Sequence, residues 1–370
     1  MVCDLAALAT TNGSSGTIAK EDQALTSLPA VKPAAKPGVR PAAYATDAGD
    51  TSVPRAVRTH EKYERLVARA KSITAVPTAV VWPCEEHALA GPTDAAAENI
   101  IAPILVGSAT RIRAAAQKAG LDIGRFAIVD VATEEEAAAA AVRLVRDGKA
   151  HSLMKGSLHT DVLMHEVVAK ESGLRAGRRI SHVFVLDVPT YPEVLFVTDA
   201  AINIFPDLET KRDIVQNAID LHIGLGLGEP RVAILSAVEV INPKIPGTTD
   251  AASLCKMAER GQIRGGILDG PLAMDNAINA EAAAIKGIHS PVAGRAQILV
   301  APDLEAGNML AKDMIFLGQA DAAGIVLGAA VPIILTSRAD GVRTRIASTA
   351  IGSLYAHHLA EQRAKEGSRA

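Results

Sequence analysis

The sequence of 370 residues contains few aromatic side chains, three cysteines and no marked excess of charge of either sign. Phe, Trp and Tyr make up 3% of the residues, so the chain lacks the aromatic platforms on which single-stranded nucleic acid stacks. With 38 basic and 41 acidic residues, the formal net charge is only −3, too small to hold nucleic acid or an anionic membrane. We expect neither partner, and an anion must therefore be bound at a local site.

Several sequence features of other protein classes are also missing. Cys3, Cys84 and Cys255 are odd in number, widely spaced and form no C-x-x-C pair, which favours a reducing cytoplasm over an oxidising compartment. No apolar run approaches the length of a membrane span, and Asp4 stands where a secretory signal would have basic residues. The chain has no G-x-x-x-x-G-K-[ST], H-E-x-x-H or G-x-S-x-G motif. We therefore expect a cytoplasmic protein.

The composition divides the chain into a tail and a folded part. Residues 1–56 are rich in Ala, Thr, Ser, Gly and Pro and have no sustained apolar period, which predicts a disordered tail. Acidic residues such as Asp4 and Glu21 argue against an Arg-rich transit peptide. The rest of the chain is long enough for two ordinary hydrophobic cores, so we expect two domains.

Short apolar runs alternate with helical patterns from residue 59 onward. The first four runs predict parallel strands joined by helices, at residues 78–81, 104–107, 127–130 and 152–156. The runs at 182–188 and 194–198 are separated by too few residues for a parallel crossover, so they predict an antiparallel hairpin. Parallel runs return at 232–235, 266–268, 298–301 and 324–327. We predict an α/β fold with mostly parallel sheets and a second domain over residues 176–330.

Polar residues gather where two of the predicted strands end and helices begin. Asp303, Glu305, Asn308 and Lys312 follow one strand, while Ser337, Arg338 and Asp340 follow another. Open α/β sheets bind ligands at such places, and a helix N-terminus beside an arginine suits phosphate. The alternatives are that Ser337 and Asp303 cap helices, that Arg338 is a surface charge, and that Glu305 pairs with Lys312.

Two further strand ends carry candidate binding residues. Lys155 could pair with phosphate while Gly156 lets the backbone approach and His159 lies nearby, although this pattern also fits an ordinary turn. Asp199 and Asn203, with Asp207, have a spacing of four that suits either a pocket or helix caps. Three hard oxygen ligands could hold magnesium, but the spacing is common and we predict no metal site.

Five blocks, in this order, resemble the phosphate acetyltransferase and phosphate butyryltransferase family. They are residues 153–160 (LMKGSLHT), 198–207 (TDAAINIFPD), 268–277 (LDGPLAMDNA), 303–308 (DLEAGN) and 333–340 (IILTSRAD). The resemblance runs from about residue 60 to 360 and is greatest to bacterial proteins that fuse this module to an upstream enoyl-CoA hydratase-like domain. The segment before residue 60 is too short for such a domain.

The resemblance implies the architecture and the reaction. Two α/β/α domains are implied, residues 57–175 completed by 331–363 and residues 176–330, with the active site in a cleft between them and a homodimer as the assembly. The reaction implied is exchange of an acetyl group between acetyl phosphate and coenzyme A by direct thiolate attack, with coenzyme A as co-substrate and no bound cofactor. We expect Ser337 and Arg338 to act on the acyl phosphate, and Arg338 to face the turn at Asp303 across one crevice.

The base that deprotonates the thiol is left open. In acetyl-specific relatives this role belongs to an aspartate seven residues after the serine, but this chain has Thr344 there, which is no useful general base. Asp340 is the nearest substitute, with Asp303 and Glu305 as others.

Three other functions compete with this hypothesis. The sequence does not fix acyl length, so a phosphate butyryltransferase is one alternative. A metal- and NAD-dependent dehydrogenase of the isocitrate or isopropylmalate type is another, and a non-catalytic protein that binds acyl phosphate or coenzyme A is the third.

Overall fold

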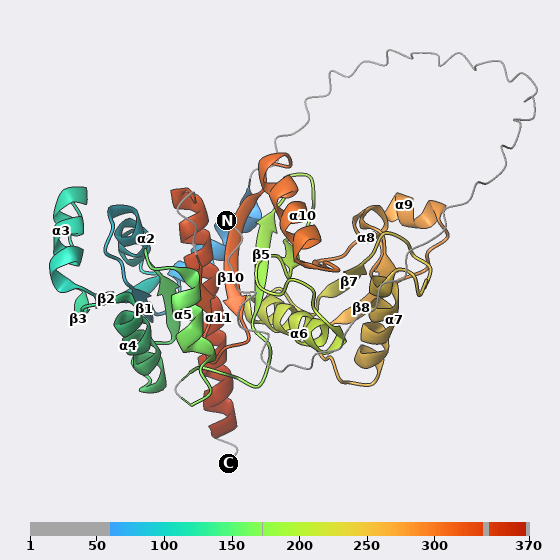
Figure 1. Cartoon of the computed structure of the whole chain (residues 1–370). Coiled ribbons are helices and arrows are strands. Elements are labelled where there is room, and N and C mark those ends of the chain that lie inside the picture. Colours follow the sequence, from blue (N-terminus) through green and yellow to red (C-terminus); the bar gives the residue numbers. More distant parts are fainter. Residues whose placement is uncertain (1–59, 172, 336–339, 368–370) are drawn as a thin grey trace, which may run out of the picture. The chain divides into compact units, whose positions relative to one another are not determined.

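The computed structural model describes residues 60–171, 173–335 and 340–367. The predicted tail and two predicted catalytic residues, Ser337 and Arg338, lie outside these ranges. The strands are β1 (Val76–Val81), β2 (Ile101–Gly107), β3 (Ala127–Asp130), β4 (Ser152–Lys155), β5 (Ser181–Asp187), β6 (Leu195–Thr198), β7 (Arg231–Leu235), β8 (Ile267–Leu272), β9 (Ile298–Val300), β10 (Asp321–Leu327) and β11 (Ile333–Ile334). Figure 1 shows them with the helices between them.

The helices mostly alternate with these strands. They are α1 (Glu61–Lys71), α2 (Glu86–Ala97), α3 (Ala109–Ala119), α4 (Glu134–Arg146), α5 (Thr160–Val168), α6 (Leu208–Gly224), α7 (Pro246–Glu259), α8 (Met274–Ile278), α9 (Ala280–Ile285), α10 (Leu304–Phe316) and α11 (Val342–Gly367). No helix in the described ranges is both long enough and apolar enough to cross a membrane.

The strands pair in the order β3-β2-β1-β4-β11-β10-β5-β6-β9-β7-β8. Neighbours are parallel from β3 to β11 and from β6 to β8, whereas β11–β10, β10–β5 and β5–β6 are antiparallel. The predicted hairpin is confirmed, with Val183 opposite Thr198. The α/β class with a mostly parallel sheet is also confirmed, while the division into two domains near residue 176 stays a prediction. Because the direction reverses three times in the centre, the two parallel halves run in opposite senses.

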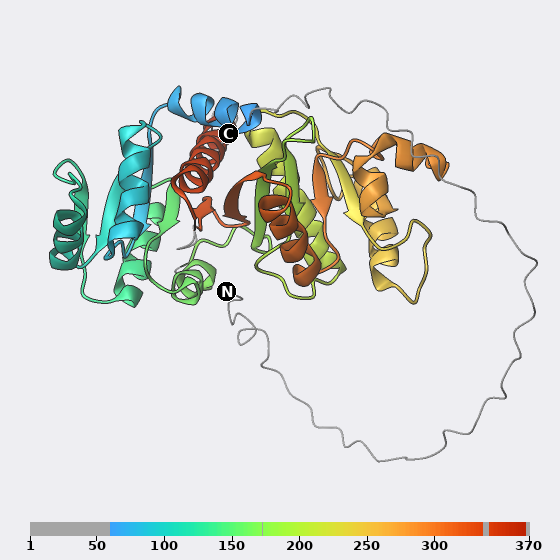
Figure 2. The same ribbon diagram turned by 90° about the horizontal axis from the view of Figure 1, so that it is seen from above.

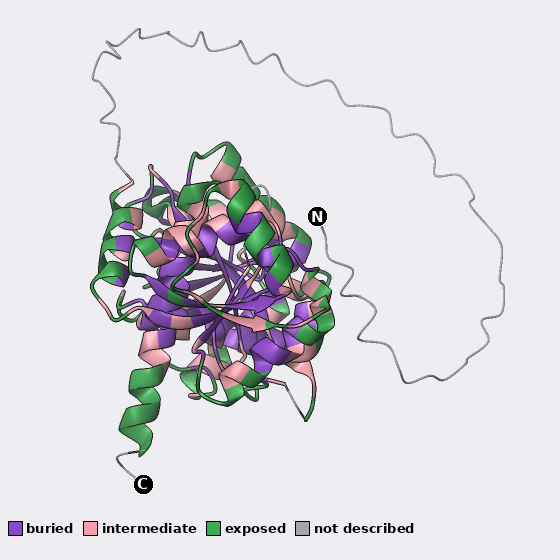
Figure 3. Ribbon diagram, turned by 90° about the vertical axis from the view of Figure 1, so that its left-hand side faces the viewer, coloured by how far each residue is buried: buried purple, intermediate pink, exposed green. Residues whose placement is uncertain are grey.

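Alternate residues of the strands beyond β11 face two different cores. In β6, for example, Phe196 packs in the larger cluster with residues of α6 and α11, while Leu195 and Val197 pack in a smaller cluster with residues of α8, α9 and α10. Helices therefore cover this half of the sheet on both faces, as the view from above also shows (Figure 2). Figure 3 shows that most strand residues are buried, whereas the outer sides of the helices are exposed. The outermost strands, β3 and β8, also contain exposed residues.

Local sequence signals explain where several helices begin. Thr133 caps α4 by accepting a hydrogen bond from the backbone N–H of Glu136 at 3.2 Å, and the Glu136 carboxylate accepts one from Ala132 N at 2.8 Å. This pair is close to a capping box, except that the carboxylate accepts from the residue before the cap, and its negative charge suits the positive end of the helix dipole. Helix α4 therefore begins with a capped, acidic first turn.

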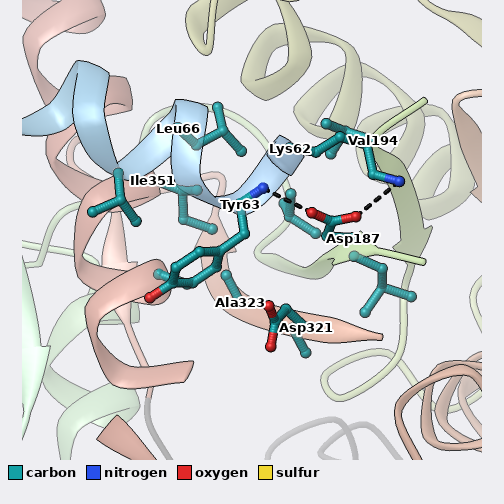
Figure 4. A pocket seen from close by; sticks show the side chains of 13 residues that line it. Lys62, Tyr63, Leu66, Asp187, Val194, Asp321, Ala323 and Ile351 are labelled. Carbon is teal, nitrogen blue, oxygen red and sulfur yellow. Dashed lines mark hydrogen bonds and ion pairs between the residues drawn. The ribbon is translucent and has the colours of Figure 1, made fainter. Parts of the chain in front are cut away.

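Helix α1 is tied to the centre of the sheet by a buried ion pair. Lys62 Nζ lies 2.8 Å from Asp187 Oδ1 on β5 and also donates to the carbonyl oxygens of Val188 and Tyr191. The other carboxylate oxygen of Asp187 accepts from Tyr63 N at 2.9 Å (Figure 4). The ammonium group thus has three oxygen neighbours, and the carboxylate has a counter-charge and one backbone hydrogen bond.

Candidate active site

The first half of the sheet has a topological switch point between β1 and β4. From β1 the chain continues to β2 and β3 on one side, whereas β4 and then β11 lie on the other side, all five strands being parallel. Ligands of open α/β sheets bind outside the carboxyl ends of the strands at such a point. Lys155, Gly156 and His159 lie at or just after the carboxyl end of β4. Because β11 is parallel to β4, its carboxyl end, which precedes Ser337 and Arg338 in the sequence, lies on the same side.

The loop after β4 is fixed onto the loop after β1. Gly156 N donates to Val81 O at 2.8 Å, and the Ser157 hydroxyl donates to Trp82 O at 2.7 Å. A Cβ atom on Gly156 would lie only 2.5 Å from Val81 O, which explains why glycine stands here. The glycine thus allows close approach of the backbone segments that leave β1 and β4.

A lysine and a helix N-terminus meet at this loop. Lys155 Nζ donates to the carbonyl oxygens of Gly156 at 3.2 Å and Leu158 at 3.0 Å, so the ammonium group lies over the turn that enters α5. His159 is the residue before the helix, is exposed, and makes no side-chain capping bond. The first N–H groups of α5 and the lysine charge together favour an anion. This agrees with the predicted phosphate role, which stays a prediction.

The start of α11 adds arginine side chains on the side of the sheet where β4 and β11 end. Arg345 Nη1 donates to Asp340 O at 2.7 Å, and Arg343 pairs with Asp321 at 2.6 Å. Arginines in the first turn of a helix add to the positive end of its dipole, an arrangement that an anion would relieve. Thr344 lies between the two arginines in that turn, and Asp340 is half-buried just before it.

The sequence reasoning missed Trp82. This side chain is buried, its φ of 55° is unusual for a bulky residue, and the Arg111 guanidinium lies 5.1 Å from its ring centroid. Nearby, burial raises the pKa of the Cys84 thiol, so this cysteine is a poor nucleophile at neutral pH. Trp82 is the one tryptophan of the chain and directly follows a predicted strand, a signal that could have drawn attention to it.

Asp199 and Asn203 form a compact hydrogen-bonded turn after β6. The Asp199 carboxylate accepts from the backbone N–H groups of His182, Ala201, Ile202 and Asn203 and from the Asn203 amide at 2.6 Å. Burial raises the pKa of Asp199, and these hydrogen bonds counteract the shift. Asn203 also donates to Ile180 O at 2.9 Å. These contacts give both side chains a clear structural task, while their predicted ligand role stays a prediction.

The residues of the 303–312 segment separate into structural and exposed positions. Asp303 caps α10 by accepting from Ala306 N at 2.9 Å, and Asn308 donates to Ala200 O at 3.0 Å. Glu305 and Lys312 are exposed on the outer side of the helix.

The strand directions separate the two predicted clusters. Strand β9, which precedes Asp303, runs opposite to β11, which precedes Ser337, and three strands lie between them. The carboxyl ends of β9 and β11 therefore lie on opposite sides of the sheet, one at the top and the other at the bottom of the strands. The strand order gives no support to one crevice shared by both clusters within a chain, and the position of Arg338 itself stays a prediction.

Comparison with known proteins identifies the family. Residues 133–353 match the family model described as phosphate acetyl/butaryl transferase. A phosphate acetyltransferase from Rhizobium meliloti is 65% identical over 295 residues, covering 80% of this chain and 93% of that protein. The chain belongs to the phosphate acetyl/butaryl transferase family.

Two further relatives of this transferase show the breadth of the family. A phosphate butyryltransferase from Clostridium acetobutylicum is 40% identical over 296 residues, covering 80% of this chain and 98% of that protein. The crystal structure of a branched-chain phosphotransacylase from Enterococcus faecalis superposes with a TM-score of 0.67 at 29% identity, covering 76% of this chain and 99% of that chain. The family inferred from five sequence blocks is confirmed.

A cavity beside α1 is too small to be the substrate site of this transferase. It lies between α1, β5, β10 and α11, with Lys62, Tyr63 and Asp187 among its lining residues (Figure 4). Its volume of about 20 Å³ holds one water molecule, whereas ligand pockets occupy roughly 300 Å³ or more. In the described ranges, no group of three or more His, Cys, Asp or Glu side chains is arranged to hold a metal ion.

The burial of His182 predicts that the stability of the transferase depends on pH. Its ring is buried against Phe184 with centroids 4.5 Å apart, Nδ1 has no partner within the described residues, and burial lowers its pKa to about 4. In the unfolded chain the pKa is near 6.5, so between these values only the unfolded state binds the proton. The free energy of unfolding should fall as pH falls from about 6.5 to 4, by about 2–3 kcal/mol at pH 4.5.

Urea unfolding at pH 7 and pH 4.5 measures this loss, with His182→Gln as the comparison. Because glutamine does not titrate, the variant should lose about 2–3 kcal/mol less than the natural protein between the two pH values. Equal losses would show that other groups, such as the buried His222, govern acid sensitivity.

Proposed function

We propose that this protein exchanges an acetyl group between acetyl phosphate and coenzyme A. Family membership makes the chain an acyltransferase with coenzyme A as a substrate. The observation that carries the acetyl assignment is its 65% identity to a phosphate acetyltransferase that it covers almost completely. Cationic side chains and the N-termini of α5 and α11 lie near the carboxyl ends of β1, β4 and β11. Their positive charge supports this location for the phosphate site.

The chemistry assigns a role to each group at this edge. The coenzyme A thiol, with an ordinary pKa near 8.5, must lose its proton, and Asp340 is the carboxylate nearest in sequence to the Ser337–Arg338 pair. The thiolate sulfur then bonds to the acyl carbon, the bond from that carbon to the phosphate oxygen breaks, and phosphate leaves with the electron pair. Ser337 would donate to the carbonyl oxygen, while Arg338 would hold the phosphate.

Asp340 is favoured over the two other candidate bases by its surroundings. Asp303 already caps α10, and Glu305 lies in the exposed first turn of that helix at the opposite edge of the sheet. Lys155 and the start of α5 would complete the phosphate site. We also propose that the enzyme acts in the cytoplasm, as a homodimer, without a bound cofactor.

The butyryl alternative has a specific observation in its favour. The phosphate butyryltransferase from Clostridium acetobutylicum is 40% identical over a nearly complete alignment. Each methylene is worth only about 1–3 kcal/mol of discrimination, so a small change in the acyl pocket could shift the preference.

One assay distinguishes these functions. Purified protein is given coenzyme A with acetyl phosphate or butyryl phosphate, with and without NAD, and thioester formation and NADH are followed. We expect thioester formation that is independent of NAD and fastest with acetyl phosphate. Faster turnover of butyryl phosphate would assign the butyryl reaction, and binding without turnover would leave a binding protein. A parallel sample given NAD, a divalent metal ion and isocitrate or isopropylmalate tests the dehydrogenase, which NADH formation there would assign.

A further inference from the structure

The first turn of α11 carries an arginine side chain that reaches back to the residue proposed as the base. Arg345 N donates to Gly341 O at 3.1 Å, and Arg345 Nη1 donates to Asp340 O at 2.7 Å. The backbone and the side chain of one residue thus hold two successive carbonyl groups at the start of the helix. Both bonds fix the short segment from which the Asp340 side chain projects.

Helix α2 provides a slot for this arginine. The two helices pack against each other, and Gly91 of α2 is buried. A Cβ atom on Gly91 would lie 3.2 Å from Arg345 Cδ and 3.6 Å from Arg345 Nε, so a larger residue there would crowd the side chain. Glycine inside a helix is less stable than alanine, and its presence here makes room for the arginine.

The arginine is not the residue that packing alone would favour in this slot. Arg345 Nε is buried and has no hydrogen-bond partner among the residues that the structure describes. A buried donor without a partner costs free energy, and a methionine of similar length would avoid this cost. A buried polar atom left without a partner therefore points to a task of the side chain other than packing.

The other arginine of this turn has different partners. The Arg343 guanidinium lies 2.6 Å from an Asp321 carboxylate oxygen and 4.3 Å from the ring centroid of Tyr63, so it joins α11 to β10 and α1. Arg345 is instead directed at the backbone of Asp340. The two arginines thus hold the start of α11 in two separate ways, and only Arg345 acts on the proposed base.

We propose that Arg345 is a positioning residue of the acyl transfer, which holds Asp340 within reach of the coenzyme A thiol. The thiol proton passes to an Asp340 carboxylate oxygen, and the electron pair stays on sulfur. Such a transfer requires a base within hydrogen-bond distance, and a displacement of about 1 Å can cost about 100-fold in rate. Arg345 touches neither reacting group and acts through the Asp340 backbone. This inference deepens the proposed function and rests on it, because it takes Asp340 as the base.

Steady-state kinetics of two Arg345 variants test this role. In Arg345→Met, kcat for thioester formation from acetyl phosphate and coenzyme A should fall at least about tenfold. The KM for acetyl phosphate should stay within about threefold, because the proposed phosphate contacts are unchanged. Arg345→Lys keeps the charge, but its nitrogen is one bond short of the position of Nη1, so its kcat should stay within about threefold of that of Arg345→Met.

Arg363→Met is the matched control. Arg363 lies near the other end of α11 and also donates to a backbone carbonyl, that of Ala330, so its loss should change kcat less than about twofold. Circular dichroism of each variant checks that the fold is retained. An unchanged kcat in Arg345→Met overturns the inference, as does full recovery in Arg345→Lys, which would assign the effect to charge.

A double-mutant cycle shows whether the effect passes through Asp340. Asp340→Asn should lower kcat at least about 100-fold, because the thiol loses its base. Adding Arg345→Met to Asp340→Asn should then cost less than about twofold more, since the group that Arg345 positions is already gone. The same tenfold loss in both backgrounds contradicts the positioning role alone. Normal turnover in Asp340→Asn instead refutes the base assignment of the proposed function, and the inference with it.

Discussion

Replacing Arg338 with alanine is expected to lower kcat/KM for acetyl phosphate by at least about 100-fold, because the departing phosphate loses its cation in the transition state. Arg338→Lys should recover only part of the loss, since an ammonium group lacks the planar pair of donors that matches phosphate. Steady-state rates with acetyl phosphate and coenzyme A, and with acetyl-CoA and phosphate, measure the effect in both directions.

The matched control for this experiment is Arg260→Ala. Arg260 is an exposed arginine at the end of α7, outside the proposed site, so its removal should change kcat/KM less than about twofold. If Arg338→Ala retained near-normal turnover, Arg338 would have no place in the reaction, and the phosphate would have to be held by Lys155 and the start of α5.

The largest loss of stability is expected from Asp187→Ala. The side chains of Lys62 and Asp187 are 10% and 4% exposed, and removal of the carboxylate leaves an ammonium group buried without its counter-charge. Breaking a buried pair in this way costs about 3–5 kcal/mol. Urea unfolding at pH 7 should therefore show a loss of this size, together with loss of the hydrogen bond to Tyr63 N.

A surface pair that joins the end of α1 to the end of α2 provides the comparison. Lys71 and Glu98 also form an ion pair, but their side chains are 42% and 48% exposed, so Glu98→Gln should cost less than about 1 kcal/mol. A similarly small cost for Asp187→Ala would mean that water reaches Lys62 once the carboxylate is gone, and the anchoring role of this pair would have to be abandoned.

Strands were predictable where local pattern decides the structure. Residues 127–130 and 152–156 read as strands because apolar runs are bounded by clear turn and capping signals, and β3 and β4 lie there. The β5–β6 hairpin followed from equally local rules. Polar residues at strand ends were also found by pattern, because each follows an apolar run directly.

The relation between the two parallel halves could not be read from local pattern. Three successive antiparallel pairings in the middle decide whether the carboxyl ends of β9 and β11 point in the same direction. These pairings join strands that are far apart in the sequence, so a local pattern does not determine them. The structural role of Asp199 could not be predicted either, because its spacing to Asn203 does not show that the carboxylate turns inward and accepts from the backbone N–H of His182. Trp82 was missed because its unusual backbone conformation leaves no periodic trace in the sequence.

The position of β11 has a consequence for how the chain is made. β4 pairs with β1 on one side and with β11 on the other, yet about 180 residues separate β4 from β11 in the sequence. During translation the ribosome therefore releases β4 with one bare edge that stays unpaired until the last part of the chain emerges. Since bare strand edges recruit other chains, this nascent stage is where aggregation should begin and where a chaperone would act.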